Sequence, residues 1–216
     1  MSAEITNRLE RCYASVVHDV LRDLDLRDFT LPSRLRPILP DKVLAGPVWP
    51  ILGKVDPTAD AHETLLAWTG LLSQCPSGHV WVNQPNDDVV AHMGELSAET
   101  LADKGVLGCV LDGMARDIDF LLKLGFQTWC SGFTPRDIVG YWLPAAVNVP
   151  IRIGMVDIAP GDWVIGDRDG MVRIPGAMID EVLEKSEEVI GTESAIRAAI
   201  KDGMDPQQAY LNFGVF

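Results

Sequence analysis

The chain has 216 residues, of which 47% are hydrophobic, so it is long enough and apolar enough to form one substantial folded domain. Its 18 lysines and arginines against 31 aspartates and glutamates give a net charge of −13. A surface this acidic repels phosphate backbones and disfavours nucleic acid as a partner, although a local pocket can still hold a small anion.

Hydrophobic periodicity predicts an alternation of helices and strands. In chain order, we expect a helix over residues 6–26, a strand at 43–51, a helix at 62–72 and a strand at 79–83. There follow a helix at 96–104, a strand at 106–112, a helix at 118–124, and strands at 128–132 and 150–158. The chain then continues with a hairpin of strands 163–166 and 171–174 and helices at 177–190 and 193–201. This mixture predicts an α/β fold in a single domain, residues 1–216.

The cysteines and the apolar runs exclude several classes of protein. No CxxC pair occurs among the four cysteines, which are Cys12, Cys75, Cys109 and Cys130, so we expect reduced thiols and not a zinc cluster. No apolar run approaches the length of a membrane span, and the polar residues 1–10 do not resemble a signal peptide. The chain is therefore expected in the reducing cytoplasm, with no membrane partner.

The first candidate site segment is Gly94-Glu95-Leu96-Ser97, at the start of a predicted helix. The first amides of a helix have no partner within the helix, and they lie at the positive end of its dipole. Such a terminus suits a carboxylate or a phosphate. The alternative is that Gly94 simply begins the helix.

The second candidate segment runs from Leu111 to Asp117, between a buried strand and a helix. Loops at the carboxyl ends of strands commonly hold ligands in α/β folds. Asp117 offers hard oxygen ligands for Mg²⁺ or Mn²⁺, and Arg116 offers a planar fork of donors that matches a carboxylate or an enolate. The alternatives are a surface salt bridge or an N-cap by Asp117. One helix and one strand separate the two segments, which predicts that both loops meet at one edge of the sheet.

Other catalytic patterns are weaker. The four histidines, including His92 just before Gly94, show no HxH or HExxH spacing, and no GxSxG or GxxxxGK[ST] motif is present. A Schiff-base aldolase needs a desolvated lysine, and the two lysines near the candidate loops, Lys104 and Lys123, lie at polar helix ends. A metal-assisted reaction is therefore favoured over an imine.

Several segments together resemble one known family. These are Gly94-Glu95-Leu96, residues 105–113 with Arg116-Asp117, residues 132–137, and the PGD and DG motifs at 160–162 and 169–170. In this order they resemble the family of the regulator of ribonuclease activity A (RraA) and the 4-hydroxy-4-methyl-2-oxoglutarate aldolases, over about residues 10–200.

The resemblance implies a three-layer β/β/α sandwich and assembly as a homotrimer or a dimer of trimers, with the tail from about residue 202 to 216 packing on a neighbouring subunit. It implies that the amides of Gly94, Glu95, Leu96 and Ser97 hold the carboxylate of a small 2-oxo acid. Arg116 would contact the keto oxygen, Asp117 would hold a divalent metal, most simply Mg²⁺ or else Mn²⁺, and Glu95 would be the acidic residue beside them. An acidic residue from a neighbouring subunit's C-terminal region would complete the site.

The resemblance implies a class II pyruvate aldolase that cleaves a 4-hydroxy-2-oxo acid such as 4-hydroxy-4-methyl-2-oxoglutarate. Oxaloacetate decarboxylation would share the same pyruvate enolate. The alternative is a non-catalytic regulator that binds a ribonuclease or a helicase, a role that the acidic surface would suit. A third possibility, a methyltransferase, lacks a glycine-rich strand-to-helix loop in this sequence. Trp129 and Trp142 are expected to add bulk at the rim of the site.

Overall fold

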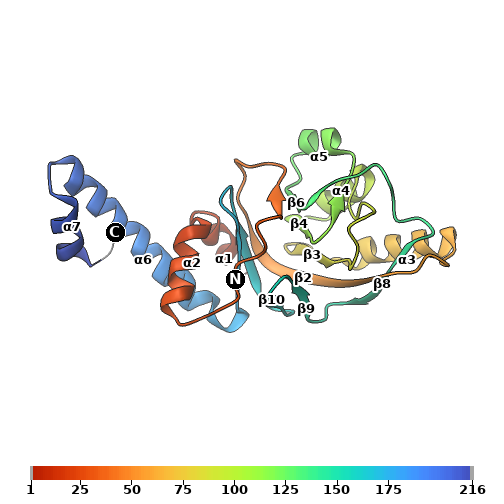
Figure 1. The fold of residues 1–216 in the computed structure, drawn as a ribbon, viewed down its shortest axis with the longest axis horizontal. Helices are drawn as coiled ribbons and strands as arrows, with labels where there is room; N and C mark the ends of the chain where they lie inside the picture. Colours follow the sequence, from red (N-terminus) through yellow and green to blue (C-terminus); the bar gives the residue numbers. More distant parts are fainter. Residues whose placement is uncertain (1, 215–216) are drawn as a thin grey trace.

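An eight-stranded sheet forms the centre of the protein (Figure 1). The structure is a computed structural model, and it describes residues 2–214. The strands follow the order β1–β6–β4–β3–β2–β11–β12, and β8 also pairs with β2. Their bounds are β1 (Arg36–Pro37), β2 (Leu44–Val55), β3 (Val80–Gln84), β4 (Gly108–Leu111), β6 (Thr128–Cys130), β8 (Trp142–Val147), β11 (Trp163–Gly166) and β12 (Met171–Ile174).

The long strand β2 joins the two parts of this sheet. Its first residues pair antiparallel with β11, its middle pairs parallel with β3, and its last residues pair antiparallel with β8. Strands β4 and β6 continue the parallel run. The carboxyl ends of β3, β4 and β6 therefore lie along one edge.

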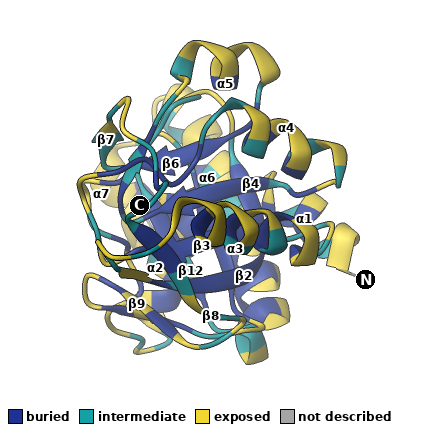
Figure 2. Cartoon of the chain, turned by 90° about the vertical axis from the view of Figure 1, so that its right-hand side faces the viewer, coloured by how far each residue is buried: buried dark blue, intermediate teal, exposed yellow. Residues whose placement is uncertain are grey.

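The two faces of the sheet pack against different layers. Successive side chains of a strand point to opposite faces, and on β3 Val80 and Val82 pack with the hairpin β9 (Ile151–Ile153) and β10 (Val156–Ile158), whereas Trp81 packs on the helical side. The helices on that side are α3 (Ala61–Gln74), α4 (Glu95–Asp103) and α5 (Ile118–Leu124). Figure 2 shows their exposed outer surfaces over the buried strands. The α/β fold class and its three layers of hairpin, sheet and helices are confirmed.

The N-terminal region differs from the single helix predicted over residues 6–26. It forms two helices, α1 (Ser2–Leu9) and α2 (Ala14–Asp23), because Tyr13 is extended at φ −132° and ψ 154°. The break is held by the Ala14 N–H, which donates to Asp167 Oδ2 at 2.8 Å. Both helices pack on the same hydrophobic cluster, and their apolar residues therefore continue one spacing that looks like a single helix in the sequence.

Other elements also depart from the prediction. Residues 150–158 form the hairpin β9–β10 because Gly154, at φ +62°, turns the chain between two short strands. The two helices predicted at 177–190 and 193–201 are one continuous helix, α6 (Ile179–Lys201), preceded by a 3-10 turn (Gly176–Met178). Strand β8 and helix α7 (Pro206–Phe213) were not predicted.

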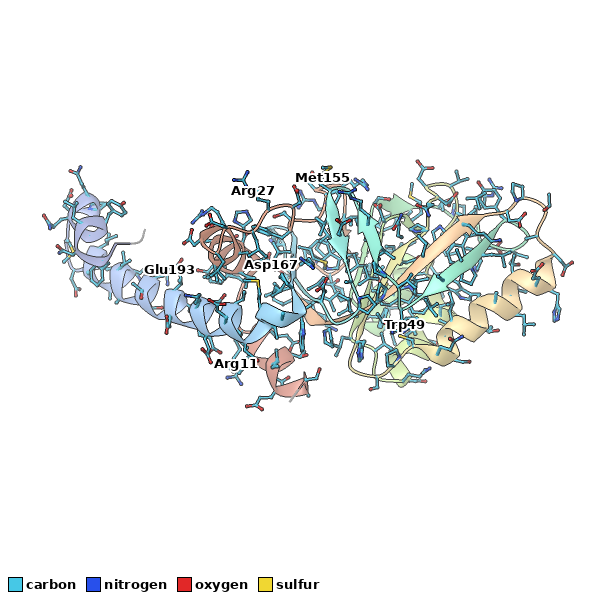
Figure 3. The ribbon with its side chains drawn as sticks, turned by 90° about the horizontal axis from the view of Figure 1, so that it is seen from below. Arg11, Arg27, Trp49, Met155, Asp167 and Glu193 are labelled. Atoms are coloured by element: carbon cyan, nitrogen blue, oxygen red, sulfur yellow. The ribbon has the colours of Figure 1, made fainter. Side chains whose placement is uncertain are left out.

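The last two helices form an arm. Helix α6 begins against α2 and then leads away from the sheet, and α7 packs against its far end (Figures 1 and 3). On α7, Tyr210 and Leu211 are exposed, and Ala209 is buried. Phe216, which belongs to the predicted docking tail, lies outside the described residues. Among residues 2–214, no helix is both long and apolar enough to cross a membrane.

The four cysteines are free and buried, which agrees with the predicted reduced thiols. Burial raises the pKa of Cys12 and Cys130 to about 11 and that of Cys75 to about 12. Since the thiolate is the reactive form, these cysteines are structural side chains of the core.

Candidate functional site

Three loops at the carboxyl edge of the parallel strands form the candidate site. They follow β3, β4 and β6, and backbone hydrogen bonds connect them. The His92 N–H donates to the Met114 carbonyl oxygen, and the Arg116 N–H donates to that of Met93, both at 2.9 Å. Within the loops, β5 (Met114–Ala115) pairs parallel with β7 (Gly132–Phe133). The structure thus brings the two candidate segments together at one sheet edge, as predicted, and adds the loop after β6.

Gly94 allows the second segment to lie against the start of α4. Its φ of −149° and ψ of −175° are extended and open to any residue, so the backbone does not require glycine here. A Cβ atom, however, would lie 2.6 Å from Asp117 Oδ2 and 3.1 Å from Arg116 Cγ. A glycine at this position is therefore needed for the close approach of the Arg116 and Asp117 side chains.

The Asp117 carboxylate faces the first turn of α4. Asp117 precedes α5 in a left-handed conformation, at φ +57° and ψ +39°, and its side chain does not cap α5. Its Oδ2 instead accepts a hydrogen bond from the Glu95 N–H at 3.1 Å. Asp117 is thus the N-cap residue of α5 by position, but its side chain does not cap that helix, and the salt-bridge alternative is present as an ion pair with Arg116. The amides of Leu96 and Ser97 follow at positions that lack an acceptor within a helix and lie at the positive end of its dipole.

Arg116 lies between two carboxylates. Its Nε is 3.6 Å from Asp117 Oδ2, and its Nη1 is 3.4 Å from Asp137 Oδ2. Both distances exceed the roughly 2.9 Å of a normal N–H···O hydrogen bond. The carboxylates therefore orient the guanidinium electrostatically, and its N–H groups can still donate to a bound oxyanion. The side chain is 37% exposed, so a ligand can reach it from the solvent.

These residues line a cleft of about 390 Å³. Gly94, Glu95, Leu96 and Ser97 lie along it with Arg116 and Asp117, so every predicted site residue is part of one cavity. Helix α3 supplies another part of the lining, which includes Trp68, whose Nε1 donates to Ser97 Oγ at 2.9 Å. This hydrogen bond joins α3 to the first turn of α4. The cavity has the size of an ordinary small-molecule site.

The structure corrects one expectation and adds two residues. Trp129 and Trp142 are fully buried and do not line the cleft, because their strands turn them into the core. Trp68 lines it instead, from a helix distant in sequence, and no sequence motif marks that residue. Asp137 was within the family-like segment 132–137, and its position after β6 was the signal that it reaches the same edge.

His92 stabilises the loop that leads into the site. It is fully buried, its Nε2 lies 3.2 Å from Asp87 Oδ2, and its ring packs edge-on to Trp142 at 5.0 Å between centroids. Burial lowers the pKa of His92 to about 4, although Asp87 opposes this change. Burial acts to raise the pKa of Asp87, but amide hydrogen bonds from Val90 and Val89 and the His92 contact leave it lowered. The neutral histidine thus anchors the loop that leads into Gly94.

The oxygen donors of the cleft fit a weakly ligated divalent metal. Within residues 2–214, no group of three or more histidine, cysteine or carboxylate side chains forms a metal cage. Mg²⁺ needs no such cage, because it commonly binds one or two carboxylates and keeps several waters. The Asp117 carboxylate is 39% exposed and lies at the cleft, where a hydrated ion can reach it. The donor set therefore suits Mg²⁺ or Mn²⁺ better than zinc.

A protein-family model for RraA-like proteins, described as Aldolase/RraA, matches residues 14–173. The chain belongs to the RraA-like family. The match contains all three site loops and confirms the resemblance inferred from the sequence motifs.

The proteins similar to this RraA-like chain carry several different names. A protein of Halalkalibacterium halodurans named "Putative 4-hydroxy-4-methyl-2-oxoglutarate aldolase" is 27% identical over 185 residues, which are 84% of this chain and 83% of the relative. A solved uncharacterised protein from Pseudomonas syringae pv. tomato aligns with a TM-score of 0.86 at 25% identity, covering 98% of this chain and 95% of that one. RraAS2 of Streptomyces coelicolor, described as an unusual member of the RNase ES inhibitor RraA protein family, aligns with a TM-score of 0.80 at 26% identity, covering 91% and 97%.

Proposed function

We propose that this RraA-like protein is a divalent-metal-dependent pyruvate aldolase that cleaves a 4-hydroxy-2-oxo acid. The observation that carries the proposal is the contact between Asp117 and the Glu95 N–H beside Arg116, which puts a hard oxygen donor, a guanidinium and a helix N-terminus in one cleft. The name of the Halalkalibacterium halodurans relative supports the reaction class.

The carboxylate of the substrate binds at the start of α4. The Leu96 and Ser97 amides donate to it, and the helix dipole favours its negative charge. Arg116 then donates to the keto oxygen at C2. The ion pairs with Asp117 and Asp137 restrict the orientation of the guanidinium at the cleft.

Cleavage breaks the C3–C4 bond, and its electron pair moves to the keto oxygen to give the pyruvate enolate. Arg116 stabilises this oxygen as its charge develops, which is the usual way in which such sites lower a barrier. We assign Glu95, which lines the cleft, to the proton transfer that turns the C4 hydroxyl into a carbonyl. The proton that Glu95 accepts is then returned to C3, which gives pyruvate and restores the Glu95 carboxylate. Mg²⁺ or Mn²⁺ bound at Asp117 would supply Lewis-acid stabilisation of the same negative charge.

Oxaloacetate decarboxylation follows from the same site, because loss of carbon dioxide leaves the same enolate. The test measures pyruvate from oxaloacetate and from 4-hydroxy-2-oxo acids, with Mg²⁺ and with a chelator. Asp117→Asn is the sharpest variant, since asparagine tolerates the left-handed backbone and can accept the Glu95 hydrogen bond but lacks the charge. We expect it to fold and to lose the metal-dependent activity. Full turnover in this variant would reject the assignment.

A regulatory role is the second candidate. The structural likeness to RraAS2 and the net charge of −13 favour a basic protein partner such as a ribonuclease or helicase. Such docking would not require Arg116 and Asp117 at the cleft. A ribonuclease that is inhibited equally by the wild type and by Arg116→Ala, with no pyruvate formed by either, would favour the regulator.

We also propose that the chain works as a homotrimer or a dimer of trimers, with the arm on a neighbouring subunit. Its support is the projection of α6 and α7 from the body (Figure 3). The exposure of the Tyr210 and Leu211 side chains on α7 supports it as well. An acidic residue of the neighbour's arm would then be available to the site.

A further inference from the structure

The cleft has an apolar wall along helix α3, next to its polar end. Leu65, Trp68, Thr69 and Leu72 recur at helical spacing along α3, and all four line the cavity. Leu96 stands at the rim with 78% of its surface exposed, and Ile138 and Val139 line the cavity as well. A ligand whose carboxylate binds at the start of α4 therefore meets mostly hydrocarbon on the α3 side.

Within the described residues of one subunit, the cleft has a single cation. Among its described lining residues Arg116 is the one basic side chain, against the acidic Glu95, Asp117 and Asp137. A neighbouring hollow of about 300 Å³ shares Arg116 and Asp117 and adds Ile118, Phe133, Thr134 and Pro135, again without another basic residue. Arg136 lies over the Tyr141 ring, 4.8 Å from its centroid, and lines neither hollow.

We propose that the substrate carries an uncharged, apolar group beyond C4, an alkyl or aryl group in place of a second carboxylate. This inference rests on the proposed aldolase function and narrows its substrate class. The first carboxylate binds at the start of α4 beside Arg116, and a distal carboxylate would meet leucine and tryptophan with three acidic side chains nearby. An unpaired charge loses its hydration there without a compensating partner, whereas each buried methylene strengthens binding about fourfold.

An isosteric pair of substrates tests the inference directly. 4-Hydroxy-2-oxoglutarate and 4-hydroxy-5-methyl-2-oxohexanoate differ only in a terminal carboxylate against an isopropyl group. Both release pyruvate, with glyoxylate from the first and 2-methylpropanal from the second. We expect kcat/KM to favour the isopropyl substrate about tenfold or more, since one unmatched charge costs at least that factor. Equal rates, or faster cleavage of the dicarboxylate, would overturn the inference and leave the aldolase function standing.

Binding of unreactive analogues gives a readout that does not need turnover. The corresponding pair is 2-oxoglutarate and 5-methyl-2-oxohexanoate, measured by calorimetry with Mg²⁺ present. Tighter binding of the second compound supports the inference even if no aldol is cleaved, in which case only the proposed reaction fails. Tighter binding of 2-oxoglutarate, or binding of neither compound, overturns the inference.

Two adjacent leucines of α3 provide a matched pair of variants. Leu65 lines the cleft and is 47% exposed, whereas Leu66 is 63% exposed and lies outside the lining. Because both side chains are partly in solvent, arginine at either position should leave the fold intact. Leu65→Arg should tighten 2-oxoglutarate binding and reverse the preference, and Leu66→Arg should leave it unchanged. An identical response of the two variants would contradict the assignment of this wall to the distal group.

Discussion

Gly94→Ala is the substitution whose effect follows most directly from the geometry of the site. The new methyl group would lie 2.6 Å from Asp117 Oδ2 and 3.2 Å from Arg116 Nε. The backbone at residue 94 is extended, so alanine adds no strain of its own. The carboxylate must therefore move by several tenths of an ångström, and the 3.1 Å hydrogen bond from the Glu95 N–H to Asp117 must lengthen or break.

The size of the effect follows from these contacts. A hydrogen bond to a charged group contributes about 1.5–3 kcal/mol, but this one is partly exposed, so the loss of folding stability should be near or below 1 kcal/mol, a few degrees in Tm. Catalysis is more sensitive to position, because a displacement of about 1 Å can cost on the order of 100-fold in rate. We therefore expect a folded protein with kcat/KM for pyruvate release reduced by about 100-fold.

The assay compares pyruvate release and thermal unfolding for the wild type, Gly94→Ala and a control. Gly170→Ala is the control, since a Cβ there meets nothing within 4 Å and the residue lies in the turn between β11 and β12, outside the cleft lining and the arm. The control should keep its activity. If Gly94→Ala turns over at the wild-type rate, the close approach of Arg116 and Asp117 to α4 has no role in the reaction.

Three further outcomes are expected. Arg116→Lys should lower kcat/KM by about 100-fold with unchanged Tm, because lysine cannot reproduce the planar fork of donors; wild-type kinetics would exclude a contact to the enolate. The pKa of His92 is about 4 in the folded chain and near 6.5 in the unfolded chain, so protonation favours the unfolded chain. The free energy of unfolding should therefore fall by up to about 3 kcal/mol as the pH drops from 6.5 toward 4. In urea unfolding, the free energy of unfolding of His92→Gln should fall less than that of the wild type between pH 6.5 and 4. An equal fall would show that the pH dependence does not come from His92. Removal of the chain from Asp202 onward should weaken the predicted trimer in sedimentation experiments, and an unchanged oligomeric state would reject docking by the arm.

Much of the architecture could be predicted from local signals in the sequence. The helix at residues 118–124 and the hairpin of β11 and β12 have the predicted bounds, because Gly125 ends the helix in a left-handed conformation and the turn at 167–170 lies between two apolar strands. The meeting of the two site loops followed from parallel topology alone, because one helix and one strand return the chain to the same edge.

The features that the sequence analysis did not predict depend on contacts between distant residues. The break before Ala14 is fixed by Asp167, which is 153 positions away in sequence. Trp68 reaches the cleft because α3 packs beside α4, and only the folded chain shows its bond to Ser97. The reason for glycine at position 94 is likewise steric and comes from Asp117, not from its own backbone angles. Contacts between distant residues also explain why Trp68, and not the expected Trp142, lines the cleft, since the burial of an aromatic side chain depends on the layers around it.

Stabilisation of a pyruvate enolate in the cleft can be measured as hydrogen–deuterium exchange of the pyruvate methyl group in D₂O, followed by NMR. This exchange requires the enolate and is independent of any distal group. With Mg²⁺ we predict exchange catalysed by the wild type, abolished by a chelator and by Asp117→Asn, and retained by Leu66→Arg. The absence of catalysed exchange by the wild type with saturating metal would show that the cleft does not stabilise the enolate.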